Sequence, residues 1–105
     1  MAKDSYGAVV SEHLRITVLR LLTEWPGYTL NESVLVDLSR DYGFSPSRDR
    51  MRTECAWLAE QGLVVVDGPA HCRIVQLTER GGDVAAGRTT VPGVKRPGPG
   101  DLPRE

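Results

Sequence analysis

The sequence predicts a mostly α-helical domain with a small β-hairpin: three helices, two strands and a short last helix between about residues 6 and 87. Two observations support this class. Apolar residues recur at steps of three and four through the first sixty residues, as they do on one face of a helix. Two runs suited to strands, residues 63–67 and 72–77, then flank a turn that contains glycine and proline.

The first helix is expected from about Tyr6 to Trp25, because Pro26 and Gly27 stop the pattern. Its apolar face consists of Val10, Leu14, Val18, Leu21, Leu22 and Trp25.

The second helix is expected after Thr29. The run Thr-Leu-Asn-Glu has the form of a capping box, with Thr29 as the cap and Glu32 reaching back to it. Asn31 is a rival cap. Gly43 is well placed to end this helix in a left-handed conformation.

The third helix is expected over residues 45–61, with Ser45 as its cap and Pro46 at the first helical position. Gly62 follows as its C-terminal glycine. The inner stripe of this helix consists of Met51, Cys55 and Leu58, and the helical wheel places Asp49, Thr53, Ala56 and Glu60 outward. The short, glycine-containing link between the second and third helices is typical of a helix-turn-helix.

Thr78 is expected to cap the last short helix, Glu79 to Ala86, which Gly81 and Gly82 weaken. The composition changes after it, since residues 88–105 contain four prolines and three glycines. We therefore expect one domain over residues 1–87 and a flexible tail over 88–105 that has almost nothing to bury. The tail has a net charge of +2.

Composition excludes several classes of protein. Thirteen basic and fourteen acidic side chains give a net charge of −1, which argues against a polybasic binder. No apolar run reaches the ~18 residues of a membrane span. The first residues lack the features of a signal peptide, so we expect a cytoplasmic protein. Without a phosphate-binding glycine loop or a Gly-x-Ser-x-Gly motif, we expect no enzyme and no cofactor.

A metal site is not expected either. The possible soft ligands are His13, Cys55, His71 and Cys72, and no CxxC or HxxxH spacing joins them. Cys55 lies on the inward stripe of the third helix, where we expect a small buried side chain.

Two segments carry a resemblance to a known family. Residues 57–64 read WLAEQGLV, and residues 77–87 read LTERGGDVAAG. With these segments the chain resembles a winged helix-turn-helix domain of the ArsR/MarR type, as in the small winged-helix proteins of Mu-like prophages. The resemblance covers about residues 6–87. It implies three helices, a two-stranded wing, a short C-terminal helix, and DNA binding with helix 45–61 as the recognition helix.

A recognition helix in the major groove brings side chains to base edges and phosphates. The first half of the third helix contains three arginines and one acid, while Glu54 and Glu60 in the second half are expected to lean away. The candidate DNA-binding residues are Ser45, Ser47, Arg48, Arg50, Arg52, Thr53 and, on the wing, Arg73. In the alternative interpretation these arginines are solvated and partly neutralised by Asp49 and Glu54.

Two functions therefore stay open. The first is a transcriptional regulator of bacterial or prophage origin that binds double-stranded DNA. The second is a winged-helix protein-interaction module in phage assembly or packaging, without specific DNA binding. A positive strip joining Arg48, Arg52 and Arg73 would favour DNA, and a patchwork with exposed apolar residues would favour a protein partner. No effector domain follows the wing, so no small-molecule ligand is evident.

Two further expectations concern partners. Lys95 and Arg96 either contact phosphates as a flexible arm or belong to a solubilising tail. A homodimer through the first helix is expected, because a small core would struggle to cover Val9, Ile16 and Leu19. In the alternative, the tail or the last helix folds over these residues and the protein is a monomer.

Overall fold

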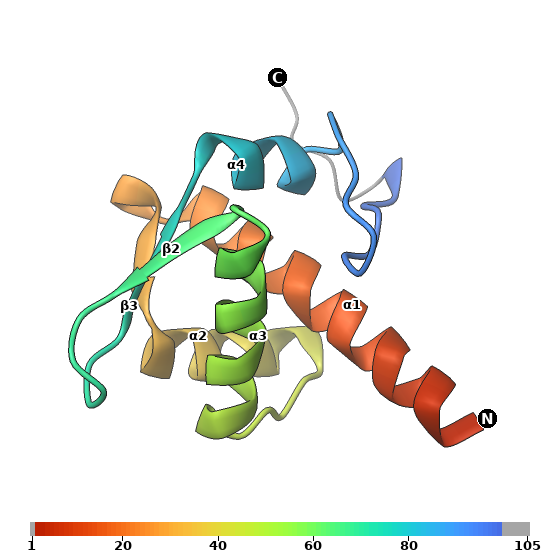
Figure 1. The fold of residues 1–105 in the computed structure, drawn as a ribbon, viewed down its shortest axis with the longest axis horizontal. Coiled ribbons are helices and arrows are strands. Elements are labelled where there is room, and N and C mark those ends of the chain that lie inside the picture. Colours follow the sequence, from red (N-terminus) through yellow and green to blue (C-terminus); the bar gives the residue numbers. More distant parts are fainter. Residues whose placement is uncertain (1, 100–105) are drawn as a thin grey trace.

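A computed structural model of the chain describes residues 2–99, with side chains from Tyr6 onward (Figure 1). Within this range the fold consists mostly of helices, with one small antiparallel sheet. The elements, in chain order, are α1 (Ala2–Glu24), the 3-10 turn η1 (Pro26–Tyr28), β1 (Thr29–Asn31), α2 (Glu32–Ser39), the 3-10 turn η2 (Arg40–Tyr42), α3 (Arg48–Glu60), β2 (Val64–Asp67), β3 (Ile74–Leu77) and α4 (Glu79–Ala85).

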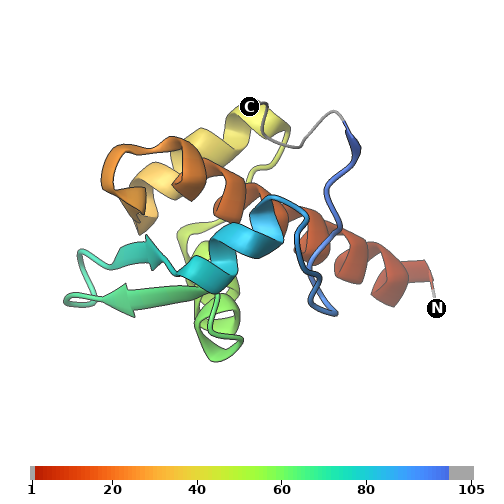
Figure 2. The same cartoon turned by 90° about the horizontal axis from the view of Figure 1, so that it is seen from above.

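The long helix α1 forms the centre of the packing. It contacts α2, α3 and α4, and Figure 2 shows α4 lying across it. Ile16 and Leu19 are 6% and 0% exposed. The expectation that a core of this size leaves them uncovered is therefore wrong, because neighbours surround this part of α1 on several sides. Val9, nearer the N-terminus, is 51% exposed.

The sheet has three strands in the order β1-β3-β2, where a two-stranded wing was expected. β1 was missed because its three residues were interpreted as the start of the second helix. Leu30 of β1 is buried and pairs with Val75 of β3. Three residues are too few for a sequence pattern to distinguish a strand from the start of a helix. Here the pairing with the distant strand β3 makes these residues a strand.

The expected capping box at the start of α2 is also wrong. Asn31, the rival candidate, is the cap: its Oδ1 accepts a hydrogen bond of 2.8 Å from the backbone N–H of Val34. Thr29 is an extended residue of β1, and its hydroxyl donates to the carbonyl of Gly27. The carboxylate of Glu32 is buried and has other partners, described below.

The cap of α3 lies two residues later than expected. Ser47, not Ser45, is the N-cap, and its Oγ accepts a 2.9 Å hydrogen bond from the N–H of Arg50. The link before it contains Gly43, whose φ of 86° confirms the predicted left-handed turn. Thr78 caps α4 as predicted, accepting from the N–H of Gly81 at 3.0 Å.

The segment after α4 packs on the rest of the domain. Val91 and Val94 are buried, and the N–H of Lys95 donates to the carbonyl of Glu12 on α1 at 3.2 Å. The expectation that this stretch has almost nothing to bury is therefore wrong for these two valines. Residues 100–105, which the same expectation covered, lie outside the described residues. Across residues 2–99 we find no helix with the length and apolar character needed to cross a membrane.

Candidate nucleic-acid interface

The orientation of α3 decides which of the candidate side chains face solvent. Met51, Cys55 and Leu58 are buried against the core, as the sequence predicted. On the opposite side, the residues predicted to point outward are all exposed: Asp49, Thr53, Ala56 and Glu60. The arginines of α3 lie on the flanks between these two faces, and each flank has its own buried carboxylate.

On one flank, the carboxylate of Glu32 binds two arginines of α3. Glu32 is 1% exposed. Its Oε1 accepts from Arg52 Nη2 at 2.8 Å and from Arg48 Nε at 3.3 Å. We call these three residues the Glu32 cluster. A buried carboxylate is costly without partners of opposite charge, so the two arginines stabilise the start of α2. The hydrogen bond from Arg52 to Glu32, together with their charge attraction, raises the pKa of Arg52.

The same two arginines also hold the loop between β2 and β3, residues 68–73. Arg48 Nη2 donates to the carbonyl of His71 at 3.0 Å, and Arg52 Nη2 donates to the carbonyl of Ala70 at 2.7 Å. The loop is therefore fastened to the first half of α3. Both arginines remain partly accessible, with 48% and 41% of their side chains exposed.

On the other flank, Glu54 is the centre of a second cluster. It was expected to lean away, but it is 3% exposed. Its carboxylate accepts from Arg15 Nε at 2.7 Å, from Arg50 Nε at 2.8 Å and from Ser11 Oγ at 2.9 Å. Burial alone would raise the pKa of Glu54, but the hydrogen bonds from Arg15, Arg50 and Ser11 outweigh that effect and hold the pKa below its usual value.

Arg15 extends this second cluster to the C-terminal segment. Its Nη1 donates to the carbonyl of Gly93 at 2.8 Å, and its guanidinium lies 3.8 Å from the centroid of the Trp57 ring. A Cβ on Gly93 would lie 2.7 Å from the Trp57 ring, so a glycine is needed for this approach. The Glu54 cluster therefore joins α1, α3 and the segment around Gly93.

The structure brings some of the sequence-predicted residues together and separates others. Arg48 and Arg52 lie beside the 68–73 loop, whereas Arg50 turns to the opposite flank and binds Glu54. The oxygen of Ser47 is used for capping, and Ser45 is exposed in the link before α3. Thr53 is exposed on the outward face.

Arg73, the candidate from the predicted wing, is half-buried at the end of the loop. Its carbonyl accepts from the N–H of Glu32, and its buried Nε has no partner within the described protein. Sequence analysis did not predict that Glu32 binds α3, because its position three residues after Thr29 suggested a capping role. Its neighbours in the chain gave no sign of the long-range contact.

The two cysteines lie in different environments. Cys55 is buried on α3 and Cys72 is exposed in the 68–73 loop, and neither forms a disulfide. Burial raises the pKa of the Cys55 thiol to about 12, and the carboxylates of Glu32 and Glu54 add to the effect. Over the part of the chain that the structure describes, no three His, Cys, Asp or Glu residues gather as metal ligands would.

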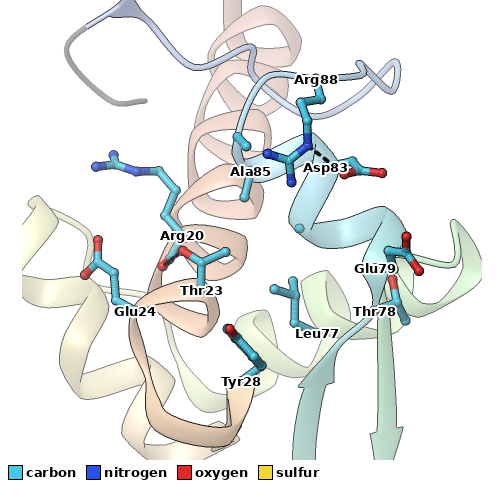
Figure 3. A pocket seen from close by; sticks show the side chains of 12 residues that line it. Arg20, Thr23, Glu24, Tyr28, Leu77, Thr78, Glu79, Asp83, Ala85 and Arg88 are labelled. Carbon is cyan, nitrogen blue, oxygen red and sulfur yellow. Dashed lines mark hydrogen bonds and ion pairs between the residues drawn. The ribbon is translucent and has the colours of Figure 1, made fainter. Parts of the chain in front are cut away.

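A groove of about 760 Å³ lies away from α3, between the end of α1 and α4 (Figure 3). Tyr28, Leu77 and Ala85 supply apolar wall, and charged residues surround them. Arg88 and Asp83 form an ion pair of 2.8 Å at its edge. The lining residues are Arg20, Thr23, Glu24, Tyr28, Leu77, Thr78, Glu79, Gly82, Asp83, Ala85, Ala86 and Arg88.

Comparison with known proteins places the chain in a phage family. It is 45% identical over 91 residues to the uncharacterised protein gp26 of Escherichia phage Mu, an alignment that covers 87% of this chain and 94% of the Mu protein. The chain belongs to the family of Mu gp26. An uncharacterised protein of Haemophilus influenzae is 41% identical over 63 residues, which are 60% of this chain and 61% of that protein. No family model and no solved structure matches significantly.

Proposed function

We propose that this member of the gp26 family is a winged helix-turn-helix protein that binds double-stranded DNA, with α3 as the recognition helix and the 68–73 loop as the wing tip. A regulator of phage or bacterial transcription is the role that this activity would serve. The proposal rests on the arrangement of α2, α3 and the β2–β3 hairpin and on the charges that they present together.

The observation that carries the proposal is the Glu32 cluster. Two half-exposed arginines share one buried carboxylate, so the cluster has a net charge of +1 at the surface where α3 meets the loop. Glu32 fixes both guanidinium groups before any ligand arrives. Arginine held in a fixed orientation loses less conformational freedom when it binds a phosphate.

The charges also limit the strength of the proposed contact. Asp49 and Glu60 are exposed on the outward face of α3 and repel phosphates. Arg50 is engaged with Glu54, and few cations remain for the backbone. We therefore expect modest affinity and a shallow salt dependence, with a slope of log K against log salt of roughly 0.9 per phosphate contact.

The test is a titration of fluorescent duplex DNA, followed by anisotropy, with paired variants. Replacing both Arg48 and Arg52 by Gln should weaken binding at least tenfold on every sequence, because the loss concerns phosphate contacts. The control is Arg80→Gln, which removes one positive charge from an exposed position on α4, away from the interface. This variant should bind DNA like the parent. A folded double variant that binds DNA as well as the parent would show that Arg48 and Arg52 do not contact DNA.

A loss of folding must be separated from a loss of contacts. The triple variant with Gln at positions 32, 48 and 52 removes the buried charge together with its partners, so no buried carboxylate is left unpaired. It should fold, as judged by circular dichroism, and still bind DNA as weakly as the double variant. If the triple variant regains the parental affinity, Arg48 and Arg52 affect DNA binding only by stabilising the folded protein.

We keep the homodimer as part of the proposal, because one recognition helix covers few base pairs. Since Ile16 and Leu19 are buried, the contact would use the exposed Tyr6 and Val9 near the start of α1, which are 74% and 51% exposed. Sedimentation equilibrium of the parent and of a Tyr6→Ser, Val9→Ser variant tests this. A monomeric parent at micromolar concentration excludes it.

A protein-interaction module remains the second candidate function. It is favoured by two exposed aromatic residues that follow α1. Tyr28, which lines the groove of Figure 3, is 56% exposed, and Trp25 is 43% exposed. Large exposed aromatic side chains are enriched at protein interfaces. Absence of DNA binding by the parent at low salt would favour this candidate over the first.

A further inference from the structure

The outward face of α3 presents acidic and small side chains in a single line. Asp49, Thr53, Ala56 and Glu60 are all exposed, and they follow one another at steps of four, three and four residues. This spacing keeps them on one side of the helix, opposite the buried inner stripe. Thr53 and Ala56 are small, so the middle of the line allows another surface to approach the helix closely.

The flanks of α3 determine what this line would face on DNA. Arg48 and Arg52 lie on the flank next to the 68–73 loop, and Figure 1 shows the start of α3 and this loop at the same, lower end of the view. In the proposed function, on which this inference rests, these arginines contact phosphates at one edge of the major groove. The line between the flanks then faces the floor of the groove, where the base edges lie.

Asp49 is well placed within this line. It is the second residue of α3, directly after Arg48 and in the first turn that Ser47 caps. The first residues of a recognition helix are the ones that reach base edges. The hydrogen bond with Glu32 is the main cause of the raised pKa of Arg52, and the charge of Asp49 adds to it. The attraction between Asp49 and Arg52 reduces the repulsion between this acid and the nearest phosphate.

The chemistry of a carboxylate selects one base of the four. An ionised carboxylate accepts hydrogen bonds and donates none. In the major groove guanine presents two acceptors, thymine an acceptor and a methyl group, and adenine an acceptor beside its amino group. Cytosine presents an amino group without an acceptor beside it. A carboxylate at the floor of the groove therefore favours the N4 amino group of cytosine over the edges of the other three bases.

We propose that Asp49 reads a cytosine in the major groove and that the methyl group of Thr53 contacts a thymine nearby. The 5-methyl group of thymine is an apolar feature of the groove, and threonine methyl groups are among its usual contacts. Asp49 and Thr53 lie ~6 Å apart along the helix axis. Base pairs are stacked ~3.4 Å apart, so the two bases are within about two steps of each other. The acid that weakens phosphate binding thus gains a function in base choice.

The first experiment selects binding sites from a pool of random DNA duplexes and sequences the enriched sites. The parent should enrich a cytosine with a thymine close to it. Asparagine has both a donor and an acceptor and matches the N7 and amino group of adenine, so the Asp49→Asn variant should enrich adenine in place of that cytosine. An acid that only stabilises the first turn of α3 would affect stability and leave base choice unchanged. The same enriched sites for both proteins would overturn the proposal.

The second experiment measures affinities for single duplexes by anisotropy. Replacing the selected cytosine pair by any other pair should weaken the binding of the parent by about fivefold or more, the usual cost of a mismatched base pair. Asp49→Ala should bind these duplexes with nearly equal affinity. Glu60→Gln is the matched control, because it removes one negative charge from the other end of the same line. It should keep the preference for cytosine, and loss of the preference there instead of in Asp49→Ala would overturn the assignment.

The thymine contact is tested with deoxyuridine, which lacks the 5-methyl group. Replacing the selected thymine by deoxyuridine should weaken the binding of the parent by about twofold to fourfold, the effect of one methyl group. Thr53→Ser keeps the hydroxyl and removes the methyl group of the side chain, so it should bind both duplexes equally. A Thr53→Ser variant that still distinguishes them as the parent does would overturn this contact.

Failure of this inference and failure of the proposed function give different results. A parent that binds every duplex equally well, and loses that binding in the Arg48 and Arg52 double variant, overturns base reading by Asp49 and leaves the DNA interface in place. A parent that binds no duplex at low salt overturns both. Circular dichroism of Asp49→Asn and Asp49→Ala should match that of the parent, since the side chain is exposed. A switch from cytosine to adenine in a folded Asp49→Asn variant is the result that supports the proposal.

Discussion

Nη2 of Arg52 lies 2.8 Å from Oε1 of Glu32, so a side chain of α3 neutralises a carboxylate that is buried at the start of α2. The same Nη2 reaches the carbonyl of Ala70 at 2.7 Å. One guanidinium thus connects a helix, its neighbour and the loop between two strands. These three parts are the ones whose relative placement defines the proposed DNA interface.

Replacing Glu32 by Ala should destabilise the protein by about 2–4 kcal/mol, because both arginines lose their shared partner and a buried space is left. Urea denaturation at pH 7 measures the loss. Hydrogen exchange should also quicken in residues 68–73, since the arginines that hold the loop are released. Glu60→Ala, an exposed acid on the same helix, is the control. Equal stability of the two variants would contradict the structural role of the Glu32 cluster.

Glu54 should make stability depend on pH. The pKa of Glu54 in the folded protein lies below the ordinary value of 4.5. Its contribution to the free energy of unfolding is therefore present above pH 4.5 and is lost as the pH falls through the folded pKa. The parent should therefore lose more stability between pH 5 and pH 3 than the Glu54→Gln variant does. Urea midpoints at these two pH values provide the comparison. Parallel losses in both proteins would show that other carboxylates cause the dependence.

The two cysteines should differ strongly in reactivity. A thiol with a pKa near 12 contains very little thiolate at pH 8, and Cys55 is buried as well. Cys72 is exposed. Iodoacetamide followed by peptide mass spectrometry should find Cys72 modified first, and Cys55 modified at a comparable rate only in urea. Early modification of Cys55 in the native protein would mean that α3 opens readily.

Adjacent glycines in α4 should respond in opposite directions to alanine. A Cβ on Gly81 would collide with the carbonyl oxygen of Leu63, whereas a Cβ on Gly82 would meet a methyl group of Leu77 at an ordinary 3.7 Å. Gly82→Ala should stabilise the protein by up to about 1 kcal/mol through helix propensity. Gly81→Ala should destabilise it by about 2 kcal/mol or more. Thermal melts of the two variants measure both effects, and a stabilising Gly81→Ala would mean that α4 lies further from Leu63 than described.

The segment after α4 should contribute to stability through its valines. Replacing both Val91 and Val94 by Thr puts two hydroxyls into buried positions at nearly constant volume, at a cost of about 2 kcal/mol in total. Val65→Thr, at a position that is 54% exposed, is the matched control and should be close to neutral. Backbone relaxation should find residues 91–95 as rigid as α1. A neutral double variant would show that the segment is not docked in solution.

Sequence patterns predicted the features that depend on residues close together in the chain. The helix α1, the cap at Thr78 and the left-handed turn at Gly43 all depend on residues close in sequence, and each is confirmed. Trp25 is the exception on the predicted apolar face, because it follows α1 and is 43% exposed. The errors at the start of α2 concern long-range contacts, whereas the shift of the α3 cap from Ser45 to Ser47 is a local one. Thr29 is a plausible cap until β3 pairs with it, and Glu32 is a plausible capping partner until Arg52 reaches it from α3.

The sequence predicted which types of residue form the candidate site, but it did not predict which carboxylate each arginine binds. The arginines of α3 stood out in the sequence, but their division between two buried carboxylates depends on which flank each one occupies and on what packs there. Val91 and Val94 were overlooked for a similar reason. Two isolated valines among prolines and glycines give no periodic signal, and their burial follows from the shape of α1 and its neighbours.

The position of β3 between β1 and β2 sets an order of events for a chain that is being synthesised. β2 and β3 are joined by a short loop, whereas Leu30 and its partner Val75 are separated by 45 positions. Closing the longer loop costs roughly 1.6 kcal/mol more in chain entropy than closing the hairpin. β1 leaves the ribosome early and waits without a partner until β3 follows. Until β3 has been made, Leu30 has no strand to pair with, so β1 can join the sheet only after the chain has been synthesised beyond Val75.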